Sequence, residues 1–109
     1  MIHLTAQTRI ELALQPLDFR KGIDGVAACC HERLQTHPRS GTLFVFFNRS
    51  RTAIRVLAYE NAQAHSGYWL MTKRLSKGRF AKLEPRGDDA PSRQIASRAL
   101  RELLRTLQA

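Results

Sequence analysis

Basic residues are concentrated in the middle of this 109-residue chain. From position 49 to position 86 the chain has nine Lys and Arg against two Asp and Glu, so this third of its length holds +7 of the net charge of +9. Most of the basic residues in the whole chain are arginines, whose planar guanidinium matches phosphate oxygens better than an ammonium group does. This pattern favours a polyanionic partner, with nucleic acid first and an acidic protein surface second.

The residues predicted to bind nucleic acid lie ahead of the first helix and in basic hairpins. They are Arg20, Lys21, Arg49, Arg51, Arg55, Lys73, Arg74, Lys77 and Arg79. For Arg20 and Lys21 a second interpretation stays open, in which they pair with Asp18 and Asp24. No helix with base-reading side chains is evident, so we predict phosphate binding with weak sequence specificity.

Catalytic chemistry has little support in the sequence. The four histidines are scattered without metal-ligand spacing, and neither a phosphate-binding glycine loop nor a nucleophile elbow is present. A metal-free ribonuclease using Tyr59, Tyr68 and the basic hairpins remains the least favoured alternative, because no general base is evident. Cys29 and Cys30 are interpreted as core residues of a helix. We therefore predict no enzyme activity, no metal and no cofactor.

Alternating apolar residues predict the strands that must position the basic side chains. These strands cover 8–14, 42–47, 53–59, 68–75 and 79–83, the last two forming a hairpin. The strand at 42–47 is apolar on both sides, which predicts a central strand with buried phenylalanines. Asn48 is expected to supply the positive φ of the following turn. Trp69 fits either a core position or an exposed platform.

Two helices complete the predicted fold. The first covers about 24–36, begins at an Asp18 or Asp24 cap and ends before Pro38. The second covers about 92–107, after a linker at 84–91, and its six apolar positions should dock on the sheet or on a partner. We predict an α+β domain at 1–109, with a mostly antiparallel sheet of about five strands and two helices, in the order strand-helix-four strands-helix.

Composition limits the cellular setting of the chain. Hydrophobic residues make up 43% and charged residues 25%, which is typical of a globular protein. The N-terminus lacks the features of a signal peptide, and no window approaches the roughly 18 apolar residues of a membrane span. A cytoplasmic protein without membrane contact is expected.

Three blocks in order carry a resemblance to a known family. Residues 18–25, DFRKGIDG, resemble its D-x-R-K-x-x-D-G opening. Residues 40–49, SGTLFVFFNR, resemble its S-G-x-L-F-V-F-x-N-R block, and residues 72–80, TKRLSKGRF, its K-R-L-x-x-G-R-F block. The family is the small accessory protein TnpB, the second open reading frame of the sixty-six family of bacterial insertion sequences. The resemblance covers about residues 8–84.

The resemblance implies an accessory protein of transposition that is encoded beside a separate transposase and has no catalytic centre of its own. DNA binding is the favoured role. The alternative is a protein-interaction module that assembles the transposase complex, which makes the cognate transposase a second expected partner. The oligomeric state stays open at this stage. The matching positions are Asp18, Arg20, Lys21, Asp24, Gly25, Ser40, Gly41, Arg49, Lys73, Arg74, Gly78, Arg79 and Phe80.

Overall fold

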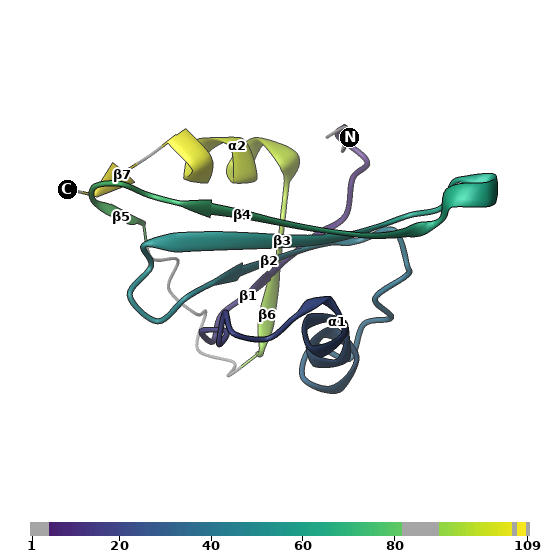
Figure 1. Ribbon diagram of the computed structural model, residues 1–109. Helices are drawn as coiled ribbons and strands as arrows, with labels where there is room; N and C mark the ends of the chain where they lie inside the picture. Colours follow the sequence, from purple (N-terminus) through teal and green to yellow (C-terminus); the bar gives the residue numbers. More distant parts are fainter. Residues whose placement is uncertain (1–4, 82–89, 106, 109) are drawn as a thin grey trace.

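The computed structural model describes residues 5–81, 90–105 and 107–108 (Figure 1). A five-stranded sheet has the order β4-β3-β2-β1-β6, and a separate ladder joins β5 to β7. The elements are β1 (Ile10–Ala13), α1 (Ile23–Glu32), β2 (Leu43–Phe47), β3 (Ala53–Glu60), the 3-10 turn η1 (Gln63–His65), β4 (Gly67–Arg74), β5 (Arg79–Phe80), β6 (Ser92–Ile95), α2 (Ser97–Arg105) and β7 (Leu107–Gln108).

The sheet is mixed but mostly antiparallel, so the predicted α+β fold is confirmed. β1 and β2 run parallel because α1 lies between them in the chain and provides the crossover that parallel strands need. The β2–β3, β3–β4 and β1–β6 pairs are antiparallel. β4 forms one edge of the sheet and β6 the other.

Each face of the sheet is covered by one helix, with α1 below and α2 above in Figure 1. The α1 face includes Phe44 and Phe46, which pack with Val26, Cys30 and other apolar residues around α1. The opposite, α2 face has a second apolar cluster formed by Ile10, Leu12, Leu43, Val45, Ile54, Ala58, Phe80, Ile95 and Leu100. Phe44 and Phe46 are at most 1% exposed, which confirms the prediction of a central strand with core phenylalanines.

The start of α1 differs from the prediction. Gly22 is the N-cap and no side chain caps the helix. Asp24 lies in the first turn, where its negative charge is favourable beside the positive helix end. Asp18 instead accepts a hydrogen bond from the backbone N–H of Arg20 (2.9 Å), which closes a tight turn before the helix. The helix ends at Glu32, four residues earlier than predicted.

The predicted helix at 92–107 is wrong over its first turn, because residues 92–95 form β6. Ile95 lies opposite Ile10 in an antiparallel ladder and is buried in the α2-face cluster. The hydroxyl of Ser92 donates to the Glu11 carboxylate (2.9 Å). By pairing with β1, residues 92–95 provide hydrogen-bond partners for the backbone groups on the edge of β1 that faces away from β2, which a helix could not do. The helix itself, α2, docks on its own sheet through Leu100, which is 3% exposed.

β5 is not the hairpin partner of β4 that the sequence predicted. It pairs with β7, and the Phe80 N–H donates to the Arg51 carbonyl (2.8 Å). Phe80 is fully buried, with its ring 5.6 Å from that of Phe47, so core packing directs this segment back across the sheet. Residues 82–83 and most of the predicted linker, 84–89, lie outside the described residues.

Candidate nucleic-acid interface

Most of the predicted nucleic-acid residues gather at one end of the sheet, which we call the turn end. It comprises the β2–β3 turn (48–52), the last residues of β4 (Lys73 and Arg74), the 75–78 connection and β5. These segments meet because β2 ends where the antiparallel β3 begins and where β4 ends, at the left of Figure 1.

Asn48 organises the β2–β3 turn through its side chain. Its Oδ1 accepts hydrogen bonds from the backbone N–H groups of Thr52 (2.9 Å) and Ala53 (3.1 Å), and its Nδ2 donates to Thr52 Oγ1 (3.0 Å). The expected positive φ is not at Asn48 but at Arg51, where φ is 57°. The prediction for the backbone of Asn48 is therefore wrong, because Asn48 closes the turn through its side-chain hydrogen bonds and Arg51 takes the left-handed conformation.

Backbone contacts hold the connection after β4 against this turn. The Leu75 N–H donates to the Thr52 carbonyl (2.8 Å), and Arg51 exchanges two hydrogen bonds with Phe80 through its carbonyl (2.8 Å) and its Nε (3.3 Å). Since Phe80 is anchored in the core, the turn and the connection have fixed relative positions. Basic residues 25 positions apart in the chain are thereby brought to one end of the sheet, with the adjacent Lys73 and Arg74 on opposite faces of β4.

The cations of the turn end are available to a ligand. Five of them are exposed, and none forms an ion pair with an acid among the described residues: Arg49, Lys73, Arg74, Lys77 and Arg79. Arg51 is half-buried and bonded to Phe80. Beside it, a hollow of about 300 Å³ is bordered by Arg49, Arg51 and the Gln15–Pro16 segment.

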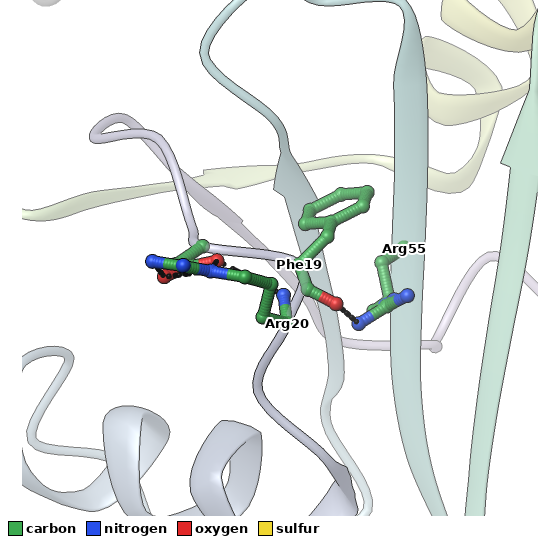
Figure 2. A network of polar contacts seen from close by, with 4 residues as sticks. Phe19, Arg20 and Arg55 are labelled. Atoms are coloured by element: carbon green, nitrogen blue, oxygen red, sulfur yellow. Dashed lines mark hydrogen bonds and ion pairs between the residues drawn. The ribbon is translucent and has the colours of Figure 1, made fainter.

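Arg55 has a structural role that the sequence did not reveal. Its Nη1 donates to the carbonyls of Phe19 (2.8 Å) and Lys21 (3.2 Å), and its Nε donates to Thr72 Oγ1 (2.8 Å). The guanidinium also lies over the Phe19 ring, 4.4 Å from the centroid. Figure 2 shows Arg55 reaching from β3 to the Phe19 carbonyl. The guanidinium is thus used to fasten the loop before α1 onto the sheet.

Arg20 pairs with Asp18, as one of its two interpretations expected, and its side chain also faces solvent, while a contact with nucleic acid stays a prediction. Its Nη2 lies 2.8 Å from Asp18 Oδ2, while 90% of its side chain is exposed. In Figure 2 it extends away from Arg55. Hydrogen bonds from the Arg20 side chain and backbone lower the pKa of Asp18 to about 2. Lys21 is exposed in the same loop.

The groups that a ribonuclease would use do not converge. Tyr59 and Tyr68 are cross-strand neighbours in edge-to-face contact (5.1 Å), with the Arg39 guanidinium over both rings. They lie about six residues, or roughly 20 Å, along the strands from the turn end. Within the described part of the chain, no three His, Cys, Asp or Glu side chains group as metal ligands. Burial raises the pKa of the Cys30 thiol to about 12, which makes it a poor nucleophile at neutral pH.

A sequence model of the family described as IS66 Orf2 like protein matches residues 8–109. The chain belongs to this family. The resemblance carried by the three sequence blocks is therefore confirmed, and the match extends beyond them to α2 and β7. Membership of the IS66 Orf2 like family supports an accessory protein of insertion-sequence transposition.

Two curated proteins of one bacterium are similar to this chain. The uncharacterized protein y4jC of Sinorhizobium fredii is 35% identical over 80 residues, which is 73% of this chain and 65% of y4jC. The uncharacterized protein y4hO of the same organism is 38% identical over 72 residues, 66% of this chain and 59% of y4hO. The chain thus matches somewhat less than two thirds of each relative. No solved structure matches it, and no described helix is long and apolar enough to cross a membrane.

Proposed function

We propose that this protein is a non-catalytic accessory factor of insertion-sequence transposition that binds DNA through the turn end of its sheet. The observation that carries the proposal is the exposed cation group of Arg49, Lys73, Arg74, Lys77 and Arg79, which lacks ion pairs with acids in the described residues. These cations are exposed to water and counterions. A phosphate backbone would replace those counterions, and their release drives binding.

The arrangement favours backbone contacts over base reading. The five cations belong to turns, to the end of the edge strand β4 and to the short strand β5, and no described helix presents them as a unit that could enter a major groove. Such contacts fix position on the duplex but carry little sequence information. We therefore expect similar affinity for duplexes of different sequence, in the cytoplasm where insertion-sequence DNA is found.

The test is a salt titration of DNA binding, measured by fluorescence anisotropy on a short labelled duplex. The double substitution Arg74→Ala, Arg79→Ala should weaken binding roughly tenfold to a hundredfold near 0.1 M salt. It should also flatten the slope of log K against log salt by about 1.8, since each phosphate contact contributes about 0.9.

A matched control removes two exposed arginines from the other end of the sheet. Arg9 precedes β1, and Arg33 follows α1 on the way to the start of β2. The double substitution Arg9→Ala, Arg33→Ala lowers the net charge by the same amount, so it should reduce affinity slightly and leave most of the slope intact. Equal effects of the two double variants would show that net charge, and not the turn end, determines binding.

A second candidate function is assembly of the transposase complex, favoured by two exposed apolar side chains. Trp69 is 45% exposed and Met71 37% exposed, both on the edge strand β4. A pull-down with the cognate transposase after nuclease treatment separates the two functions. Retention of the transposase would support direct assembly, whereas its loss would support bridging by DNA.

A further inference from the structure

The outer edge of β4 is unpaired among the described residues, because β4 ends the sheet and pairs with β3 alone. The Leu75 N–H donates inward to the Thr52 carbonyl (2.8 Å). In an antiparallel pair, alternate residues direct both backbone groups to the same neighbour. Extending the register from Leu75 therefore directs the odd-numbered residues of β4 toward β3. The even-numbered residues direct their N–H and C=O groups outward, and these are Tyr68, Leu70, Thr72 and Arg74.

The two ends of β4 carry complementary side chains, so the strand is complementary to a second, antiparallel copy of itself. Aromatic residues, Tyr68 and Trp69, begin the strand, and cations, Lys73 and Arg74, end it. Met71 stands between them and is exposed, as is Trp69 on the same α2 face. A second, antiparallel copy of the strand would therefore meet aromatic residues with cations, and cations with aromatic residues.

We propose that two copies of this chain associate by pairing their β4 strands antiparallel about a two-fold axis at Met71. In this register Trp69 lies opposite Lys73 of the other copy, Tyr68 opposite its Arg74, and Met71 opposite its own equivalent. The outward groups of the even-numbered residues form a ladder of about eight hydrogen bonds. The two five-stranded sheets then become one continuous sheet.

The other registers fit less well. In two antiparallel strands related by a two-fold axis, opposed residues lie on the same face of the sheet. The axis must therefore pass beside a residue, and moving it by one residue changes the partner of every residue by two positions. Moving the axis by one residue, to Leu70 or Thr72, sets Lys73 opposite Gly67 or Met71, where no aromatic ring faces it. Moving it to Lys73 sets lysine against lysine, which is destabilising. Moving it to Trp69 leaves Lys73 and Arg74 without aromatic partners on β4. The register at Met71 alone pairs residues 68–74 in full and sets every cation against an aromatic ring.

The proposal also accounts for the exposed apolar side chains. Opposed residues on the α2 face form the closely spaced, non-hydrogen-bonded pairs of the new ladder, with Cα atoms about 4.5 Å apart. Met71 would pack on its equivalent, and Trp69 would lie against the lysine stem and ammonium of Lys73, a favourable cation–π pair. Charged residues usually protect an edge strand from such pairing. Here both stand at one end, so reversal brings aromatic rings opposite them.

The first experiment tests the centre of the interface with opposite charges. The nuclease-treated protein should show, by light scattering after gel filtration, twice the chain mass of 12.4 kDa at high concentration. Met71→Asp and Met71→Lys each set like charges against each other at the axis, so each variant alone should be monomeric. Mixing the two variants should restore the dimer, because aspartate then faces lysine.

The second experiment tests the register by cysteine crosslinking. Met71→Cys places two thiols in directly opposed positions whose Cα spacing of about 4.5 Å suits a disulfide. Trp69→Cys and Lys73→Cys each lie four residues, or about 13 Å, from their own equivalents and serve as controls. Mild oxidation should link Met71→Cys alone. The native Cys29 and Cys30 are buried and should not contribute.

Three results would overturn the proposal. One is a monomeric wild-type protein at every accessible concentration. Another is a dimer that persists in Met71→Asp with the fold intact by circular dichroism. The third is crosslinking at position 69 or 73 in place of 71. Lys73 and Arg74 belong both to the paired strand and to the turn end, so DNA binding is tested independently of the dimer at Arg49, Lys77 and Arg79, which lie outside that strand.

Discussion

The two ends of the β3–β4 hairpin are built from the same pair of strands but treat their cations differently. At the far end, Arg39 lies over the rings of Tyr59 and Tyr68, so its charge has an intrachain partner. At the turn end, Arg74 and Arg79 are exposed and lack acidic partners among the residues described. The number of basic residues is therefore a poor guide to a binding surface. What matters is which of them already make contacts within the fold.

The largest expected effect comes from removing the Asn48 side chain, which shapes the turn end. Asn48→Ala leaves the backbone N–H groups of Thr52 and Ala53 without their acceptor, at a cost of about 2 kcal/mol in the free energy of unfolding. DNA affinity should fall as well, because Arg49 and Arg51 lose their fixed positions. Urea denaturation and the anisotropy assay measure the two effects.

The matched control for this variant lies in the β3–β4 connection, at the end of the sheet opposite the turn end. The exposed Asn61 accepts a hydrogen bond from the Ser66 hydroxyl (3.0 Å). Asn61→Ala should change the free energy of unfolding by less than about 0.5 kcal/mol and leave DNA affinity unchanged. A loss of DNA affinity in Asn61→Ala similar to that in Asn48→Ala would contradict the assignment of binding to the turn end.

Two lysine substitutions test the difference between an arginine that is hydrogen-bonded within the fold and one that is exposed. Arg55→Lys keeps the charge but loses the forked hydrogen bonds to Phe19, Lys21 and Thr72, so it should destabilise the fold by about 1–2 kcal/mol. Arg74→Lys should alter stability by less than about 0.5 kcal/mol. Midpoints of urea denaturation distinguish the pair. If both variants unfold at the wild-type midpoint, the structural role of Arg55 is wrong.

The smallest expected effect concerns the exposed ion pair beside the interface. The pKa of Asp18 is lowered to about 2 by its hydrogen bonds with Arg20. A depressed carboxyl pKa stabilises the folded state above the ordinary value of 3.8, and this contribution is lost as the pH falls through about 2. The carboxyl carbon shift of Asp18 in NMR spectra should therefore titrate near pH 2. In Arg20→Ala it should titrate closer to 3.8, and a midpoint already near 3.8 in the wild type would exclude the pair.

The central part of the fold was predictable because its strands have strong local signals. Leu43 to Phe47 and Ala53 to Tyr59 are mostly apolar, strand-like runs bounded by polar turns. β6 was missed because Ile95 fits the helical spacing of the leucines in α2 as well as it fits a strand. Its identity depends on the open edge of β1, more than 80 positions earlier, which a local pattern does not report. The short β5–β7 ladder has the same long-range origin.

The candidate site was predictable as a group but not in its internal roles. Arg49, Lys73, Arg74, Lys77 and Arg79 come together because hairpin geometry brings neighbouring turns to one end of a sheet. Arg55 could not be separated from them, since its carbonyl acceptors lie in a loop 34 to 36 residues away. Asn48 could be placed in a turn because asparagine is common there, but its bonds to the backbone four and five residues later could not be foreseen.

The left-handed backbone of Arg51 has a consequence for the thermodynamics of binding. A non-glycine residue at a φ of 57° is strained by about 1 kcal/mol, and here Phe80 holds it in place from both sides. That contact fixes the backbone of the β2–β3 turn relative to Phe80 before any ligand arrives. Little conformational entropy of the backbone is then left to lose when a phosphate backbone docks. The β2–β3 turn can therefore bind with a rigid backbone, and the conformational freedom lost on docking is confined to its side chains.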